Sequence, residues 1–199
     1  MAEVKVLVEG IHKMLDDGKM RIGSTVTLIK SNKNIIVDTG SFLDKDQLIE
    51  GLNKEGFSVE DIDAVILTHL HLDHTVNTYL FKNAKIYYRL RGGNFIGLVG
   101  FPQEGKIQRN DLENDTEIAE NVSILLTPGH TEDLISVVVK TSVGNVIITG
   151  DAIDSEKMAD LNNPPGFYWD LDEFNKSRRK ILEIADYIIP GHGGMFKVK

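Results

Sequence analysis

The histidines of this chain are gathered in a way that restricts how it can fold. The sequence has six histidines, and five of them lie in three short segments. These are Thr68-His69-Leu70-His71-Leu72-Asp73-His74, Thr127-Pro128-Gly129-His130 and Pro190-Gly191-His192-Gly193. A fourth segment, Thr149-Gly150-Asp151, adds an aspartate after a glycine. A fold that brings the four segments together forms one polar site from distant parts of the chain.

The first segment has the spacing of a metal site. It follows a predicted buried strand over 62–67, and in extended backbone the side chains of His69 and His71 point to the same face. Asp73 and His74 come where the chain turns into a predicted helix, which directs them toward a second position. We therefore expect a two-metal site, whose ions typically lie about 3.5–4 Å apart.

The remaining candidate ligands are His130, Asp151 and His192, and each follows a glycine that permits a tight turn. Imidazole and carboxylate together suit zinc, iron or manganese rather than magnesium or calcium. The chain has no cysteine, which excludes thiolate zinc sites, disulfides and a cysteine nucleophile. The sixth histidine, His12, stands alone, and we expect it to be an exposed surface residue without a role in activity.

Composition limits the remaining choices. A chain of 199 residues with 41% hydrophobic content is long enough for one domain, which we expect to span residues 1–199. The net charge of -8 argues against a broad basic surface for nucleic acid. No segment approaches the roughly 18 apolar residues of a membrane span, and the N-terminus lacks a signal core. We expect a soluble, cytoplasmic protein with no membrane partner.

The predicted elements alternate between strands and helices. We expect strands at 4–9, 24–31, 34–37, 62–67, 85–88, 121–126, 135–140, 145–148 and 187–189, and helices at 44–55, 73–81 and 171–185. Segments 34–40 and 145–151 are similar, since both are apolar strands that end in a turn of Thr, Gly and Asp. The similarity suggests two β-rich halves that face each other. The fold class is then α/β, as a four-layer αββα sandwich.

Two long loops are candidates for binding substrate. The loop 89–115 carries basic and aromatic residues, namely Arg89, Arg91, Lys106, Arg109, Phe95 and Phe101. The basic residues either contact phosphates or are solvated charges, and the aromatic residues stack a base, line an apolar pocket or anchor the loop. The loop 153–170 carries Trp169, the only tryptophan. It forms either the other wall of the cleft or a contact between the subunits of a homodimer.

The ligand pattern resembles that of the metallo-β-lactamase superfamily, whose signature is His-x-His-x-Asp-His with later His, Asp and His. The resemblance covers the chain from Ile35 to His192 and implies a ligand set. It assigns His69, His71 and His130 to the first metal, Asp73, His74 and His192 to the second, and Asp151 to both. It implies that Asp38 orients the ligands without binding metal and that Asp73 also takes part in proton transfer. One departure is Val76, where many members have glycine.

A narrower resemblance is to the single-domain hydrolases called metallo-β-lactamase domain-containing protein 1. It rests on 23–28, on 177–180 and on the ending Pro190-Gly191-His192-Gly193-Gly194-Met195-Phe196-Lys197-Val198. An animal relative in that group is assigned RNA endonuclease activity on histone transcripts, which makes RNA a candidate substrate. Substrates diverge widely on one fold, so the resemblance does not decide between RNA and a small molecule.

The expected function is that of a di-metal hydrolase, with zinc as the expected metal and iron or manganese as alternatives. A hydroxide bridging the two ions would attack an ester, lactone, phosphodiester or related bond. The alternatives are an RNA endonuclease or phosphodiesterase, a mono-iron persulfide dioxygenase with a similar ligand set, and a metal-binding scaffold without activity. Metal content distinguishes the dioxygenase from the di-metal hydrolase, because the dioxygenase holds one iron per chain and the hydrolase two metal ions.

Overall fold

Two β-sheets form the centre of the computed structural model, which describes residues 1–89 and 116–199. In this part of the chain the first sheet has five strands in the order β1-β4-β5-β6-β7. They are β1 (Glu3–Val8), β4 (Val26–Lys30), β5 (Asn34–Val37), β6 (Ala64–Ile66) and β7 (Lys85–Tyr87). The second sheet has six described strands in the order β13-β12-β11-β10-β9-β8. They are β8 (Thr116–Ala119), β9 (Val122–Leu126), β10 (Ile135–Thr141), β11 (Gly144–Ile148), β12 (Tyr187–Ile189) and β13 (Phe196–Lys197).

The sheets pack face to face because their central strands are apolar on both faces. In β5, Ile35 and Val37 join the core between the sheets, whereas Ile36 belongs to the core on the outer face. Alternate residues of a strand point to opposite faces, which produces this division. In the second sheet Ile148 belongs to the same inner core, and Ile147 faces outward. Each sheet is therefore buried on both sides.

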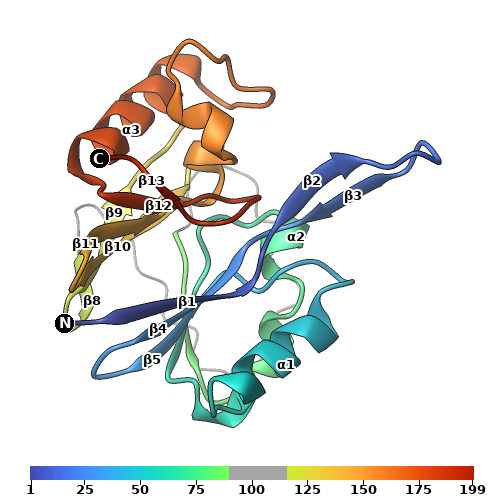
Figure 1. Cartoon of the computed structure of the whole chain (residues 1–199), viewed down its shortest axis with the longest axis vertical. Helices are drawn as coiled ribbons and strands as arrows, with labels where there is room; N and C mark the ends of the chain where they lie inside the picture. Colours follow the sequence, from blue (N-terminus) through green and yellow to red (C-terminus); the bar gives the residue numbers. More distant parts are fainter. Residues whose placement is uncertain (90–115) are drawn as a thin grey trace.

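One long helix covers the outer face of each sheet (Figure 1). Helix α1 (Lys45–Lys54) buries Leu48 and Leu52 against the first sheet. Helix α3 (Leu171–Ile184) buries Phe174 and Ile181 against the second sheet. The order helix, sheet, sheet, helix confirms the predicted αββα sandwich. Among residues 1–89 and 116–199, no helix combines the length and the apolar composition that a membrane span needs.

The segment after β1 was not predicted to have regular structure, and it forms a hairpin. Strand β2 (Ile11–Met14) pairs with β3 (Met20–Gly23) in a separate two-stranded sheet. The hairpin projects from the body of the molecule beside α2 (Leu72–Thr75), as Figure 1 shows. A signal for it was present in the sequence, because Asp17-Gly18 is a common turn pair between short strands.

The segment that carries the first ligands also differs from its prediction. Strand β6 ends at Ile66, so His69 and His71 lie in a loop and not in an extended strand. The predicted helix 73–81 is instead the short helix α2 followed by the 3₁₀ turn Thr78–Leu80. His71 occupies the position before α2, and Asp73 lies in the first turn of that helix. The other short 3₁₀ turns of the described chain are Val59–Asp61, Gly150–Ile153 and Glu156–Ala159.

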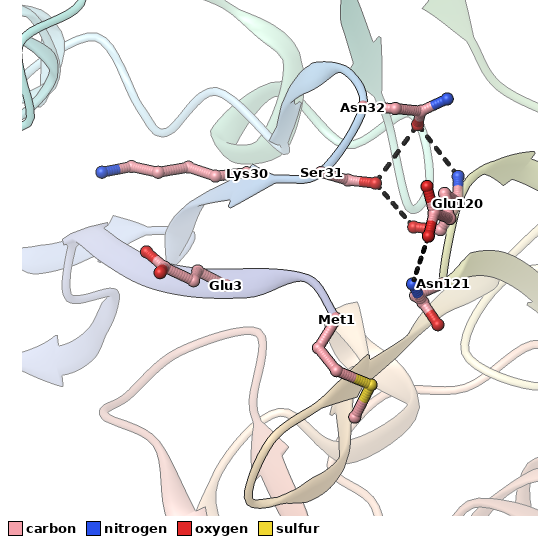
Figure 2. Close-up of a pocket in the computed structure, with 7 residues that line it drawn as sticks. All are labelled: Met1, Glu3, Lys30, Ser31, Asn32, Glu120 and Asn121. Atoms are coloured by element: carbon pink, nitrogen blue, oxygen red, sulfur yellow. Dashed lines mark hydrogen bonds between the residues drawn. The ribbon is translucent and has the colours of Figure 1, made fainter.

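The turns at one end of the sandwich hold the two sheets together. Ser31 follows β4, and its hydroxyl donates a hydrogen bond to the carbonyl oxygen of Glu120 at 2.6 Å. The Glu120 amide donates to the side-chain oxygen of Asn32 at 3.0 Å. Figure 2 shows these bonds beside a surface hollow of about 460 Å³. This hollow lies at the start of strands β5 and β9. The predicted ligands follow the ends of strands, so the hollow is not part of the predicted metal site.

Candidate metal centre

The seven predicted ligands lie together in two groups. One group is His69, His71, His130 and Asp151, and the other is Asp73, His74 and His192. Within each group, the donor atoms lie within 4.8 Å of one another. The ligands lie in loops and short helices that follow β6, β9, β11 and β12. Both sheets therefore contribute ligands to both groups.

In the first group, three imidazole nitrogens face one another. Nδ1 of His71 lies 2.9 Å from Nε2 of His69 and 3.1 Å from Nε2 of His130. Oδ2 of Asp151 lies 3.2 Å from Nε2 of His130 and 3.8 Å from Nε2 of His69. Four potential donors are thus directed at one small volume.

In the second group, the other oxygen of Asp151 takes the corresponding place. Its Oδ1 lies 3.3 Å from Nε2 of His74 and 3.3 Å from Nε2 of His192. Oδ2 of Asp73 lies 3.7 Å and 3.6 Å from the same two nitrogens. The Asp151 carboxylate therefore presents one oxygen to each group.

Backbone carbonyls decide which imidazole nitrogen faces the centre. Nδ1 of His130 donates a hydrogen bond to the carbonyl oxygen of Phe167 at 3.1 Å. Nδ1 of His192 donates to the carbonyl oxygen of Gly23 at 2.9 Å. A carbonyl can only accept, so these Nδ1 atoms carry the proton and the neutral rings turn a bare Nε2 toward the centre. Hydrogen bonds of this kind orient metal-binding histidines.

Asp38 contacts His74 directly and His69 through Thr68. Its Oδ2 accepts hydrogen bonds from Nδ1 of His74 at 2.7 Å and from the hydroxyl of Thr68 at 2.8 Å, and its Oδ1 accepts from the Thr68 amide at 2.8 Å. The Thr68 hydroxyl lies 3.1 Å from Nδ1 of His69. Asp38 is buried and has a positive φ of 56°. This conformation is uncommon for residues other than glycine, although aspartate and asparagine adopt it more readily than most.

The buried residues of the centre shift one another's pKa values. Burial lowers the pKa of His69 well below its usual value. Burial also opposes protonation of His74, but the Asp38 and Asp151 carboxylates outweigh it and raise the pKa of His74 well above the ordinary range. For Asp151, burial acts against ionisation, and the neighbouring His74 and His192 outweigh it and hold its pKa well below the usual value. The site favours a negative Asp151 next to positive charge.

Two buried atoms at the centre indicate a place for a cation. Nε2 of His74 and Oδ1 of Asp151 have no hydrogen-bond partner among the described residues. Buried polar atoms without partners are rare and costly, so each example requires an explanation. A divalent cation explains them, because it would bind these atoms together with the converging lone pairs of the other imidazoles. Imidazole and carboxylate donors fit zinc, iron or manganese.

Two glycines make the close approach of these segments feasible. Gly150 has a φ of 49°, and a Cβ at this position would lie 2.5 Å from the Thr68 hydroxyl oxygen. A Cβ at Gly191 would collide with the Asp151 carboxylate. Any larger residue at either position would displace a ligand or its neighbour. The structure gives a physical reason for the predicted glycine turns before Asp151 and His192.

A cavity of about 360 Å³ opens beside the centre. Ligands of both groups line it, including His71, Asp73 and His192. One wall is the β2–β3 hairpin, through His12 and Ile22, and the other is the segment 165–167. Among the described residues that line the cavity, none is lysine or arginine.

His12 is the residue that the sequence interpretation missed. Its side chain is exposed, as expected, but the His12 ring lies 5.5 Å from the His192 ring, measured between centroids. Its position beside the centre depends on the hairpin, which places residues 12 and 22 opposite each other. The turn pair Asp17-Gly18 between the two strands was the available signal.

The other predicted substrate residues have different positions. Arg89 donates a hydrogen bond to the carbonyl oxygen of Glu132 at 3.3 Å, near the His130 turn. The Trp169 amide donates to the carbonyl oxygen of Gly129 at 2.7 Å, whereas Phe167 lines the cavity. Val76 has ordinary helical angles, φ -62° and ψ -30°, so no glycine is needed there. Arg91, Phe95, Phe101, Lys106 and Arg109 lie outside the described residues.

Comparisons with known proteins agree with this geometry. The sequence profile of the metallo-beta-lactamase superfamily matches residues 21–192. Metallo-beta-lactamase domain-containing protein 1 of Xenopus laevis is 34% identical, over 98% of this chain and 81% of its own length. Its human counterpart is 31% identical over 82% of this chain, which spans only 59% of the human protein.

Two solved structures show the same fold. A metallo-beta-lactamase-like protein of Thermotoga maritima has a TM-score of 0.76 at 25% identity, over 98% of this chain and 99% of that protein. A dizinc quorum-quenching lactonase, solved with its product N-hexanoyl homoserine, has a TM-score of 0.65 at 23% identity. The match covers 87% of this chain and 74% of the lactonase.

Proposed function

The chain belongs to the metallo-β-lactamase superfamily, and from this premise we propose that it is a di-metal hydrolase of small acyl substrates. The bond cleaved would be a carboxylic ester, a lactone or a thioester. Zinc is the expected metal, with iron or manganese as alternatives. The likeness to the dizinc lactonase supports the choice of metal count and bond type.

The bridging position of Asp151 carries this proposal. Its two oxygens each lie 3.2–3.3 Å from imidazole nitrogens of different groups. With Asp151 shared, each group has at least three further protein donors, so neither is a partial site. A single-metal protein would leave the Oδ1 side of Asp151 and Nε2 of His74 without a partner.

The protein residues divide the chemical work between them. When bound, the two ions would act as Lewis acids and lower the pKa of a water molecule toward neutrality. His71, His130 and His192 line the cavity and would hold the ions on the side where a substrate enters. Asp73 lines the cavity and is only partly buried, so its carboxylate can hold a proton on its way to the leaving group.

The charge of the cavity favours a small acyl substrate over RNA. The described lining has three carboxylates, Asp73, Asp151 and Asp154, and neither lysine nor arginine. A polyanion needs several cationic contacts, since its affinity comes mainly from neutralising phosphates. Arg89 already bonds to the backbone beyond His130. An RNA endonuclease would depend on Arg91, Lys106 and Arg109, so it remains the second candidate.

Elemental analysis together with a hydrolysis panel tests the proposal. The purified protein should hold two divalent ions per chain and cleave lactones and thioesters faster than phosphodiesters or a β-lactam. One iron per chain with oxygen consumption on a persulfide would instead support the dioxygenase. Faster RNA cleavage that weakens steeply with salt would favour the nuclease. His69→Ala should abolish cleavage, whereas Asp186→Asn, at a partly buried acid beside the start of β11, should retain it.

A further inference from the structure

The β2–β3 hairpin places a histidine at the metal centre that neither ligand group includes. His12 on β2 lies directly opposite Ile22 on β3. Residues that are directly opposite in a hairpin project to the same face, and both of these line the cavity. Their neighbours Lys13 and Arg21 form the next pair, so they project to the other face. One face of the hairpin is therefore turned to the centre.

Hydrogen bonds attach the base of the hairpin to the ligands. The Gly23 carbonyl oxygen accepts from Nδ1 of His192 at 2.9 Å. The Ser24 amide donates to the carbonyl oxygen of Asp73 at 3.1 Å. The Thr25 amide donates to the carbonyl oxygen of Gly191 at 2.7 Å. Since these bonds join the hairpin to ligand-bearing segments, the position of His12 relative to the centre is fixed.

The His12 ring is available to a bound molecule. It packs edge-on against His192 and makes no hydrogen bond to any of the described residues. The opposite wall of the cavity is apolar. The Phe167 side chain there is 70% exposed, and its ring lies 5.8 Å from the His130 ring. A molecule in this cavity meets a polar donor on one side and apolar surface from Ile22 and Phe167 around it.

We propose that His12 and Ile22 determine substrate specificity. A ring N–H of His12 donates a hydrogen bond to an oxygen of the substrate beside the bond that is cleaved. Ile22, facing Phe167 across the cavity, contacts the apolar chain of the acyl group. The proposal rests on the acyl hydrolase function, and it assigns His12 to substrate positioning and not to metal binding.

Binding of octanoate, the product of an acyl ester, tests the proposal without depending on turnover. Titration calorimetry on the metal-loaded protein should give an affinity about fivefold weaker for His12→Ala, the loss expected for one hydrogen bond. His12→Gln should restore most of it, because the amide is also a donor. Lys13→Ala, on the opposite face, should bind as the wild type does. Ile22→Ala should weaken octanoate but not acetate, and Arg21→Ala should weaken neither.

Kinetics and metal content complete the test. With an acyl lactone, His12→Ala should raise KM with little change in kcat, and elemental analysis should find the wild-type metal content. Loss of a metal ion from His12→Ala would make His12 a ligand and overturn the proposal. Wild-type octanoate affinity and KM in that variant, or no octanoate binding by the wild type, would also overturn it. If octanoate binding depends on His12 but no acyl substrate is cleaved, only the proposed hydrolase function fails.

Discussion

Replacing Asp38 by asparagine should weaken metal binding although Asp38 binds no metal itself. The Asp38 carboxylate acts only as an acceptor in its hydrogen bonds with the described residues. The donors are the Thr68 amide, the Thr68 hydroxyl and Nδ1 of His74. An amide has one oxygen, so either orientation sets its NH₂ group against a donor. With the NH₂ group facing His74, the imidazole proton is driven to Nε2, the atom that must be bare to bind metal.

The magnitude follows from the role of such hydrogen bonds. Loss of the group that orients a ligand typically lowers metal affinity about 10–100-fold, which is about 1.4–2.7 kcal/mol. Asparagine tolerates the positive φ of 56° at this position, so the backbone should keep its conformation. The effect should therefore be seen in metal affinity and less in the folding of the metal-free chain.

A competitive zinc titration against a chromophoric chelator measures the effect. Asp186→Asn is the matched control, because Asp186 is a partly buried acid that also accepts a hydrogen bond from a backbone amide, that of Asn145 at 2.8 Å, but it lies at the start of β11 and not at the ligand end. This control should lose stability and keep wild-type metal affinity. If Asp38→Asn binds two zinc ions as tightly as the wild type, the reasoning about the His74 tautomer is wrong.

Three further predictions concern turnover, a buried arginine and metal removal. Asp73→Asn should reduce kcat even in excess zinc, since an amide cannot carry the proton, and full rescue by zinc would refute this role. Arg178→Met should lower the free energy of unfolding by about 3 kcal/mol or more, because the buried guanidinium donates hydrogen bonds to backbone carbonyls of 158–163. The control Arg179→Ala, at an exposed residue, should change the free energy of unfolding by less than about 0.5 kcal/mol. Chemical denaturation measures the free energy of unfolding of both arginine variants. Adding zinc at about 1,000 times Kd to chelator-treated protein should stabilise it by about 4 kcal/mol, or raise Tm by about 8–16 °C, and an unchanged Tm would contradict metal binding to the folded state.

The ligands could be predicted because their pattern is local. The short segment 69–74 contains His69, His71, Asp73 and His74. Glycines before Asp151 and His192 mark two of the other segments. The apolar strands before them were also visible, and β5 and β12 have the predicted bounds. The four-layer fold followed from these strands and from the two helices between them.

The hairpin wall of the cavity could not be predicted, because it depends on contacts between distant segments, whereas the wall at 165–167 lies in the loop 153–170 that was one of the candidates. The part played by His12 depends on the hairpin pairing and on the bond from His192 to Gly23, 169 residues apart in sequence. Strand β6 does not continue to His69 and His71, because the chain leaves the sheet at Thr68, whose amide bonds to the Asp38 side chain, although His71 has extended angles of φ -67° and ψ 146°. Local patterns indicate ligand types, whereas the shape around them is a tertiary property.

The metal centre also has a structural consequence for the two halves. His69 and His71 follow a strand of the first sheet, whereas His130 and Asp151 follow strands of the second, and the second group is divided in the same way. Each bound ion would therefore join the two sheets, and Asp151 would connect both ions. The free energy of metal binding then adds to the packing of the inner core. Metal loss should for this reason weaken the contact between the sheets and not only the loops that carry the ligands.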